Sequence, residues 1–397
     1  MNGHHSVYIA NQEEARSILG KIGSDPGSFP YMAPKAVHRC IKLKNISCAA
    51  ANIIKQEMLS RGGEAAIARE AIIARSRTDV LLMGTIKQYE LLIDKLKKQP
   101  LELAKLAAEV KNILDSLESG SRTLELANGR ELEIGKKTLV MGILNVTPDS
   151  FSDGGKYIET DRAIAHAWEM IEQGADIIDI GGASSRPDSV MADQEEELKR
   201  VLPVVKNLSA QGITISVDTC RAGVARAALD NGAHIINDIG SLKLDPNMVP
   251  VISEKQAPVI LMHNRLQINK GQAYEDIISD IVGELQDAAE SLERLGLNRS
   301  KIMVDPGIGF GKSPGENLLI IKQLSAFKSM GFPVVVGISR KSFIGRTLDL
   351  DVDERLEGSL GLLAVSIMNG ADMVRVHDVK ESCRVAQIVD AVVRLNG

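Results

Sequence analysis

The sequence predicts an α/β protein, a (β/α)8 TIM barrel preceded by a small α+β domain. From Leu139 onward, short runs rich in Ile, Val and Leu alternate with helical segments eight times within about 260 residues. Such near-continuous apolar runs are typical of parallel strands that are buried on both faces. The first 120 residues lack this alternation, and 397 residues exceed one average domain.

Residues 1–120 are predicted to form a small α+β domain with the order β, α, β, β, α, α. After a polar lead with Gly and Pro at 23–34, the predicted strands are 37–46, 65–73 and 80–83, and the predicted helices are 49–59, 86–98 and 101–117. Ser47 suits the start of the first helix, and Pro100 separates the last two. No motif here indicates chemistry, so the role is open between oligomerisation and regulation.

A polar linker at 118–121 leads into a predicted β-hairpin at 123–132. Its Asn128-Gly129 pair lies between alternating residues, which is a strong signal for a two-residue turn. Because this hairpin comes directly before the first barrel strand, we expect it to cover the amino-terminal mouth of the barrel.

The barrel prediction covers residues 121–397. The predicted strands are 139–146, 175–182, 213–219, 234–240, 258–263, 301–307, 333–339 and 373–379. The predicted helices include 162–173, 195–209, 222–230, 273–295, 316–330 and 381–395. A doubly wound open sheet is the lesser alternative. In a barrel all strands direct their carboxyl ends to one face, so polar residues at strand ends must meet there.

Composition excludes several classes of protein. A net charge of −5 and a pI of about 5.9 give no basic face for nucleic acid. The four cysteines are scattered without a C-x-x-C pair, so neither a zinc site nor a disulfide framework is expected. No stretch approaches 18 apolar residues, and the N-terminus lacks an apolar run after a basic start. We therefore expect a cytoplasmic protein that does not bind a membrane.

Polar residues follow nearly every predicted barrel strand. The first strand ends in Asn145 and a glycine-rich loop. Acceptors end the third, fourth and sixth strands, and cations follow the second, seventh and eighth: Asp218, Asn237 and Asp305, then Arg186, Lys341 and Arg375. A carboxylate beside an amide suits the edge of a heteroaromatic ring, whereas cations suit phosphate. We expect the acceptors on one side of the rim and the cations on the other.

Each of these residues also has a structural interpretation. Asp218 alone could cap a helix, Arg375 and Asp378 could form a surface ion pair, and His377 could be a packed or capping residue. The glycine turn after Asp305 is not a P-loop, because Pro306 stands where that motif requires Gly. A purely structural barrel has no reason to gather acceptors and cations on one rim, so together they indicate a ligand site.

Seven segments in order resemble the dihydropteroate synthases, the enzymes that join a pterin to p-aminobenzoate. They are NVTPDSFSDGG, DIGGASSRP, SVDTCR, INDIGSL, VDPGIGFGK, GISRKSFIG and RVHDV, and they span the barrel but not the first 120 residues. The resemblance implies condensation of 6-hydroxymethyl-7,8-dihydropterin diphosphate with p-aminobenzoate, release of pyrophosphate and a requirement for Mg2+. It also implies inhibition by sulfonamides, which mimic p-aminobenzoate.

The resemblance assigns the site residues to three groups. The pterin group is Asp218, Asn237, Asp305 and Lys341, with Met262 lining the pocket. The diphosphate group is Asn145, Arg375 and His377, with Asn145 also as the Mg2+ contact. The p-aminobenzoate group is Ser185, Arg186, Pro187, Phe310 and Ser342. Two departures affect this last group: Ala183 stands where many members have Glu, and Ser185 where Thr is usual.

The chemistry agrees with these residue types. An arylamine is already a nucleophile, so no Ser, Cys or Lys has to be activated. Expelling pyrophosphate is the harder task, and cations can stabilise the charge that develops on it. We expect only small molecules as substrates and a homodimer as the assembly.

Two other functions compete with this interpretation. A pterin-binding methyltransferase on the same barrel would need no cations after the seventh and eighth strands, and the chain lacks a D-x-H-x-x-G corrinoid signature. A non-catalytic pterin sensor would use the first 120 residues as its output module. Pyrophosphate release separates the three, since only the synthase produces it.

Overall fold

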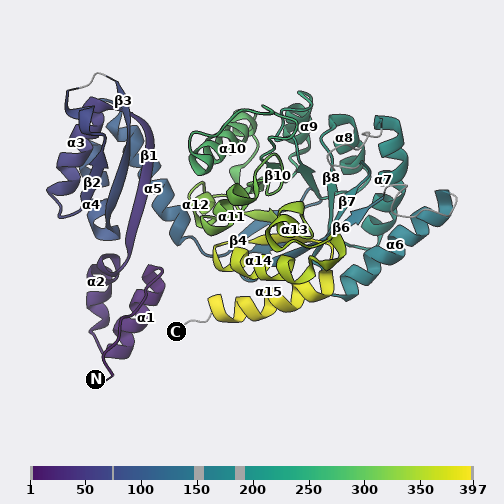
Figure 1. Cartoon of the computed structure of the whole chain (residues 1–397), viewed down its shortest axis with the longest axis horizontal. Helices are drawn as coiled ribbons and strands as arrows, with labels where there is room; N and C mark the ends of the chain where they lie inside the picture. The colour runs from purple at the N-terminus through teal and green to yellow at the C-terminus, as the bar shows by residue number, and fades with distance from the viewer. Residues whose placement is uncertain (1–2, 74–75, 147–155, 184–192, 395–397) are drawn as a thin grey trace. The chain divides into compact units, whose positions relative to one another are not determined.

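The computed structural model describes residues 3–73, 76–146, 156–183 and 193–394, with the side chains of residues 156–159 left aside. The described chain divides into two compact units, Met1–Ser119 and Gly120–Arg394. Figure 1 labels their elements, and each unit is described by itself.

The first unit is a three-stranded antiparallel sheet with helices. Its elements are α1 (Gln12–Ile22), α2 (Phe29–Ala36), β1 (His38–Ser47), α3 (Cys48–Leu59), β2 (Glu64–Ile67), β3 (Arg77–Thr85), α4 (Ile86–Leu96) and α5 (Leu103–Glu118). The strand order is β1-β3-β2. Apolar residues of α3, α4 and α5 form one core with the sheet. As expected, Ser47 caps α3, because its Oγ accepts from the backbone N–H of Ala50 at 3.3 Å.

One predicted strand of this unit was too long, and two helices were missed. The strand expected at 65–73 ends at Ile67, and the chain continues as a 3-10 turn, Arg69–Ile72. No helix was predicted before the first strand, yet α1 precedes the polar lead at 23–34 and α2 begins within it. Helix α1 buries only Ala15, although Ala15, Ile18, Leu19 and Ile22 recur at helical spacing, and it begins where the Asn11 side chain accepts from the backbone N–H of Glu14. Helix α2 begins with a proline in its first turn, where the missing N–H is tolerated.

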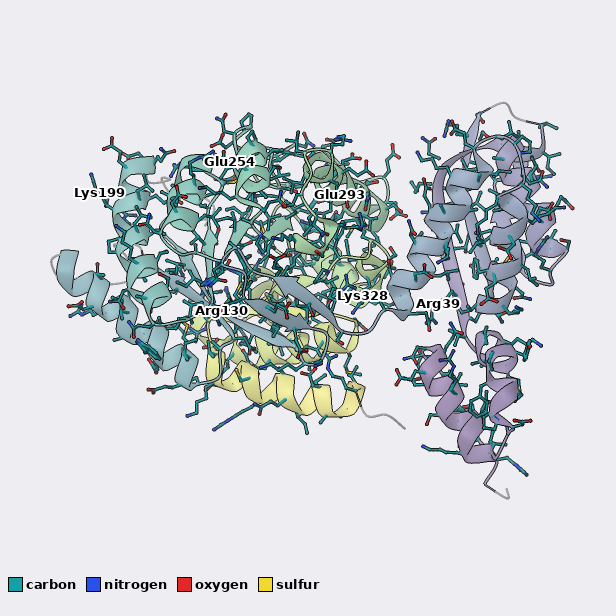
Figure 2. All side chains as sticks on the ribbon, turned by 180° about the vertical axis from the view of Figure 1, so that it is seen from behind. Arg39, Arg130, Lys199, Glu254, Glu293 and Lys328 are labelled. Atoms are coloured by element: carbon teal, nitrogen blue, oxygen red, sulfur yellow. The ribbon has the colours of Figure 1, made fainter. Side chains whose placement is uncertain are left out.

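The hairpin lies at the base of the second unit, as predicted. Strands β4 (Arg122–Glu125) and β5 (Glu131–Ile134) pair antiparallel. The loop is longer than the expected two residues, because the N–H of Leu126 donates to the Arg130 carbonyl at 2.7 Å and Gly129 takes a φ of 79°. Arg130, labelled in Figure 2, donates to the carbonyl of Gly212 at 2.7 Å and ties the hairpin to the barrel.

Eight parallel strands form the predicted barrel. They are β6 (Leu139–Asn145), β7 (Ile177–Gly181), β8 (Ile215–Asp218), β9 (Ile235–Asp238), β10 (Val259–Met262), β11 (Ile302–Asp305), β12 (Val335–Gly337) and β13 (Met373–Val376). Their order is β11-β10-β9-β8-β7-β6-β13-β12, and a parallel bridge between Val304 and Val334 joins the two outer strands. The barrel prediction is therefore confirmed, with strands shorter than expected.

Helices surround these strands (Figure 1). They are α6 (Lys156–Glu172), α7 (Gln194–Ala210), α8 (Ala222–Asp230), α9 (Met248–Lys255), α10 (Ile277–Glu293), α11 (Pro314–Lys322), α12 (Ser325–Lys328), α13 (Ser342–Leu348), α14 (Leu356–Met368) and α15 (Val379–Val393). The helix expected at 316–330 is split into α11 and α12. None of the described helices is long and apolar enough to cross a membrane.

The period of two along each strand decides which residues reach the mouth of the barrel. Apolar residues at the strand starts pack inside the barrel against the hairpin: Leu124, Leu126 and Ile134 meet Leu139, Met141, Ile177, Ile235, Ile260, Met303, Val335 and Met373. The amino-terminal mouth is thus covered, as predicted. Because side chains alternate, the inward residues at the other end are Asn145, Asp179, Asp218, Asn237, Met262, Asp305 and Arg375.

Candidate active site

An arginine from the last strand joins two carboxylates at the barrel mouth. Arg375 donates through Nε to Asp179 Oδ2 at 2.6 Å and through Nη2 to Asp218 Oδ2 at 2.7 Å. Asn237 donates from Nδ2 to the same Asp179 oxygen at 3.2 Å. Strands β7, β8, β9 and β13 therefore share one polar network.

The buried position of Asp218 alters its acidity. Burial raises the pKa of Asp218 to about 7, against the opposing effect of Arg375 and with a further increase from Asp179. A carboxyl group that titrates near neutral pH in a recess is typical of a functional site. Asp218 is therefore more than the helix cap considered above, since α8 begins without a side-chain cap.

Asp238 lies next to Asn237 in sequence but serves the backbone. Its two carboxylate oxygens accept from the N–H groups of Gly240 and Leu242, at 2.8 and 2.6 Å. Burial raises its pKa to about 6. This carboxylate stabilises the loop after β9 and faces away from the Asp218 network.

A second group of polar residues lies where β11 and β12 end. Asp305 accepts from the N–H of Gly307 at 2.7 Å, and burial raises the pKa of Asp305 against the effect of Lys341. Lys341 donates to the carbonyl of Ile308, and its Nζ lies 4.4 Å from the centre of the Phe310 ring. Burial lowers the pKa of Lys341 to about 8. This site thus holds a carboxyl, an ammonium and an aromatic face.

The glycines of the turn after β11 make this arrangement possible. Gly307, Gly309 and Gly311 all have positive φ, at 67°, 84° and 71°. A Cβ on Gly309 would lie only 2.7 Å from Lys341 Cδ. The turn therefore requires glycine both for its backbone conformation and for the close approach of the lysine.

The structure excludes the ion pair considered for Arg375 and corrects one expectation about the rim. Arg375 does not pair with Asp378, because Asp378 pairs with Arg340, whose Nε donates to it at 3.0 Å. The acceptors and cations do not occupy opposite sides either, since Arg375 lies between Asp179 and Asp218. Pairing each cation with acceptors offsets the cost of burying the charges.

Several predicted residues meet at the mouth, and others lie at its edge. Met262 packs with Cys220, Ile239 and Phe310 in a small apolar cluster beside the polar network. His377 and Ser342 are exposed, and the His377 ring lies 3.2 Å from Ser339 Oγ. Ser185, Arg186 and Pro187 lie outside the described residues.

Asn145 is the candidate metal ligand at the end of β6. A Cβ built on Gly181 would lie 3.7 Å from both Asn145 Oδ1 and the Asp218 Cβ, so the amide shares the mouth with the carboxylates. Within the described residues, no hydrogen bond occupies this amide and no group of three His, Cys, Asp or Glu could hold a metal alone.

Sequence reasoning missed Asp179, which anchors Arg375. This residue is fully buried, and its signal was an acidic residue inside the otherwise apolar run IIDIG. Side chains alternate along a strand, so Asp179, two residues before Gly181, lies on the same inward face of β7 as Gly181. The alternation of side chains along β7 would by itself have predicted that Asp179 lies in the barrel mouth beside Asp218.

Comparison with known proteins identifies the family. A sequence model described as pterin binding enzyme matches residues 141–377. The chain is 47% identical over 263 residues to the dihydropteroate synthase of Bacillus subtilis, an alignment that covers 66% of this chain and 91% of the relative. A solved structure of the Xanthomonas albilineans dihydropteroate synthase with 4-aminobenzoic acid matches with a TM-score of 0.65 and 37% identity, covering 68% of this chain and 98% of that one.

One further relative extends the similarity beyond the barrel. A probable bifunctional folylpolyglutamate synthase/dihydropteroate synthase of Halobacterium salinarum is 37% identical over 386 residues, which cover 96% of this chain and 46% of that protein. This alignment is longer than the barrel unit and so includes most of the first unit. With its barrel, its polar mouth and these relatives, the chain belongs to the pterin-binding enzyme family, as a dihydropteroate synthase.

Proposed function

We propose that the barrel mouth condenses 6-hydroxymethyl-7,8-dihydropterin diphosphate with p-aminobenzoate and releases 7,8-dihydropteroate and pyrophosphate in folate biosynthesis. The observation that carries this function is the convergence of Asp218, Asp305 and Lys341 at one mouth, with an arginine bound among them. The family match and the relative bound to 4-aminobenzoic acid support both substrates.

The pterin ring binds against the carboxylates. Asp218 and Asp305 accept from its ring and amino N–H groups, and Asn237 offers an amide next to them. Lys341 places a positive charge at the ring edge, and Met262 covers an apolar face. A buried acceptor that meets a donor of the ligand gives specificity, because an analogue without that donor leaves the acceptor unpaired.

The p-aminobenzoate side is formed by Phe310 and Ser342, together with Ser185, Arg186 and Pro187. Phe310 offers an aromatic face at the mouth, and Ser342 opens helix α13, whose first N–H groups suit a carboxylate. Sulfonamides carry the same arylamine and an acidic group, so this group of residues is also their binding site.

Asn145, Arg375 and His377 face the diphosphate. The amine nitrogen attacks the pterin methylene carbon, the carbon–oxygen bond to the diphosphate breaks, and the amine loses one proton. Negative charge grows on the leaving group during this step, and a cation held in advance by Asp179 stabilises it without rearrangement.

Mg2+ fits the donors at this edge. An amide oxygen is a hard ligand, and Mg2+ typically combines one or two protein ligands with substrate phosphates and water. Asn145 would hold it, with the remaining positions left to the diphosphate. Bound there, the ion would neutralise charge on the leaving group.

Pyrophosphate release tests this function. Purified protein with the pterin diphosphate should release pyrophosphate only when p-aminobenzoate is present. Release of no pyrophosphate under either condition, with tight pterin binding, would favour a sensor. A methyltransferase would be indicated by turnover of a methylated folate instead.

We further propose that the chain acts as a homodimer through helices α14 and α15. These helices pack together, and they expose large apolar side chains: Met368 at 62%, Ile388 at 63% and Val392 at 65%. Clustered exposed apolar residues of this kind are typical of protein interfaces. Light scattering should give a dimer that Ile388→Glu/Val392→Glu separates, whereas Leu295→Glu, at an exposed leucine after α10, should leave it intact.

The remaining proposals concern the first unit and the compartment. Residues 1–120 form an independent domain that contributes no group to the reaction, and residues 121–397 form the catalytic barrel. All four cysteines are free, including the exposed Cys40, which suits the reducing cytoplasm.

A further inference from the structure

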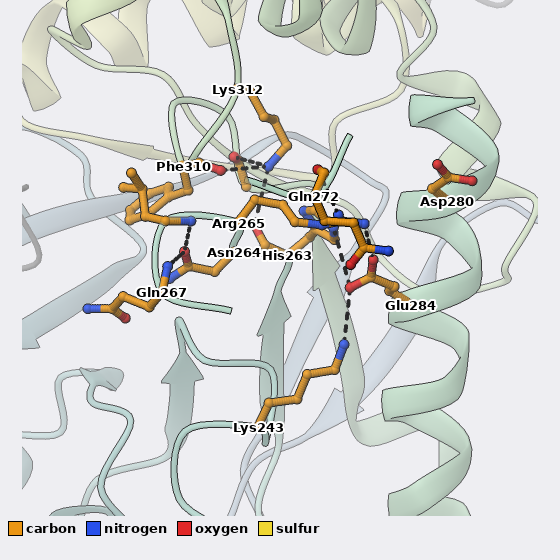
Figure 3. Close-up of polar contacts among 12 residues, drawn as sticks. Lys243, His263, Asn264, Arg265, Gln267, Gln272, Asp280, Glu284, Phe310 and Lys312 are labelled. Atoms are coloured by element: carbon orange, nitrogen blue, oxygen red, sulfur yellow. Dashed lines mark hydrogen bonds and ion pairs between the residues drawn. The ribbon is translucent and has the colours of Figure 1, made fainter. Parts of the chain in front are cut away.

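Lys312 closes the glycine turn that carries Phe310. Its Nζ donates to the backbone carbonyls of Gly307 at 2.8 Å, of Phe310 at 3.2 Å and of His263 at 3.4 Å (Figure 3). Within the described chain no carboxylate forms an ion pair with it. The ammonium therefore donates its hydrogen bonds to backbone carbonyls of two loops, one after β10 and one after β11.

The loop after β10 holds the same turn from a second direction. The N–H of Arg265 donates to the Phe310 carbonyl at 3.3 Å, so this oxygen accepts from both loop and lysine. Arg265 is itself fixed, because its guanidinium pairs with Glu284 (Figure 3). The guanidinium also lies 4.6 Å from the centre of the Tyr274 ring. The glycine turn after β11 is therefore bonded to a loop whose arginine is itself held in place.

The two loops approach each other too closely for side chains to separate them. A Cβ on Gly307 would lie 1.7 Å from the His263 carbonyl oxygen, and a Cβ on Gly311 would lie 2.5 Å from the Arg265 carbonyl carbon. Carbonyl oxygens brought together in this way repel one another unless a donor lies between them. Lys312 supplies that donor.

Burying a lysine ammonium at this place costs stability, which indicates a functional role for Lys312. Burial lowers the pKa of Lys312 to about 7, although Asp305 opposes the change. An apolar side chain of similar length would avoid this cost, since an ammonium that loses its water is destabilising. Natural proteins depart from such stability rules mainly at functional sites.

We propose that Lys312 is a positioning residue that orients Phe310 for p-aminobenzoate. By joining the Gly307 and Phe310 carbonyls to the end of β10, it fixes the turn and keeps the Phe310 ring under Lys341. This inference rests on the proposed function, which assigns the aromatic face to p-aminobenzoate. Of the pterin residues, Asp218 and Asn237 lie on other strands, whereas Asp305 and Lys341 each contact the turn through one hydrogen bond.

Lys312→Met tests the role, because methionine keeps the length and removes the donors. We expect the KM for p-aminobenzoate to rise about 10-fold, a loss typical of a displaced contact group. The affinity for the pterin without phosphates should fall by a smaller factor, because only Asp305 and Lys341 among its residues contact the turn. Lys243→Met is the matched control, since Lys243 pairs with Glu284 at 3.1 Å from the outer side, and it should change neither value.

Three outcomes would overturn the inference: an unchanged KM for p-aminobenzoate, equal weakening of both substrates, or the same change in Lys243→Met. If Lys312→Met fails to fold, Lys312→Gln, which keeps an amide donor but loses the charge and the reach of the ammonium, should still raise the same KM above that of the unmodified chain, and an unchanged KM would overturn the inference. Pyrophosphate release by the unmodified chain is measured first. If that release does not require p-aminobenzoate, the proposed function fails; if it does and the KM is unchanged, only the role of Lys312 fails.

Discussion

Arg375 donates to Asp218 at 2.7 Å, so a cation assigned to the diphosphate is bonded to a carboxylate assigned to the pterin. The bond joins the eighth strand of the barrel to the third, across 157 residues of sequence. Removing Arg375 leaves the Asp218 carboxylate buried without its cation, which is costly, whereas removing Asp218 leaves Arg375 paired with Asp179 alone. The two halves of the site are therefore coupled.

Arg375→Ala should weaken the binding of both ligands, and it should weaken the binding of the pterin diphosphate more than that of a pterin without phosphates. Without the guanidinium the pKa of Asp218 rises further above its ordinary value, because burial and Asp179 act unopposed. The loss for the phosphate-free pterin should then shrink when titration calorimetry is repeated at pH 8.5 instead of 7. Equal losses at both pH values would show that Arg375 does not control Asp218.

Asp305→Asn should lower pterin affinity by about 1 to 3 kcal/mol, roughly 5-fold to 150-fold, because the amide presents a donor where the ligand needs an acceptor. Asp238→Asn is the matched control. Its carboxylate is equally buried but accepts from backbone N–H groups, so this change should lower the melting temperature and leave pterin affinity unchanged. Affinity that falls alike in both variants would contradict the assignment of Asp305.

The pH dependence of kcat/KM for the pterin diphosphate should be bell-shaped. Burial raises the pKa of Asp218 to about 7, so the acceptor is lost as pH falls below that value. Burial lowers the pKa of Lys341 to about 8, so its charge is lost as pH rises above that value. Lys341→Arg should remove the fall at high pH, since arginine keeps its proton. A high-pH fall that persists in this variant would assign it to another group.

His263 should lower the free energy of unfolding in acid. Burial lowers its pKa to about 3, with Lys312 adding to the effect, whereas an unfolded histidine titrates near 6.5. Between these values only the unfolded chain binds the proton, so the free energy of unfolding falls as pH drops from about 6.5 towards 3. Urea unfolding at pH 7.5 and 5 should show a smaller difference in His263→Gln than in the unmodified chain. The exposed His166→Gln serves as control and should show no such reduction.

Deleting residues 1–119 should leave a folded and active barrel. The first unit has its own apolar core, and no described candidate site residue precedes Asn145. Circular dichroism and pyrophosphate release measure the two properties separately. A folded truncation without activity would give the first unit a part in the reaction.

Much of the fold follows from local pattern. Each barrel strand is an apolar run of a few residues, and the hairpin carries its own turn sequence, so both were predicted without knowledge of the rest of the chain. Helix α1 was missed although Ala15, Ile18, Leu19 and Ile22 recur at helical spacing, and α2 was missed because it contains two prolines, which usually interrupt a helix. The positions of Asp218, Asn237 and Asp305 at the mouth also followed from sequence, since parallel strands in a barrel end at one face.

Tertiary structure alone decided how those residues pair. Asp179 and Arg375 are 196 residues apart, and their bond of 2.6 Å depends on the register between strands that do not neighbour each other. The same holds for Lys312, whose three carbonyl partners come from two loops. Sequence specifies the periodicity that brings charged groups to one mouth. Their partners and their acidity depend on distances and burial, which exist only once the barrel has closed.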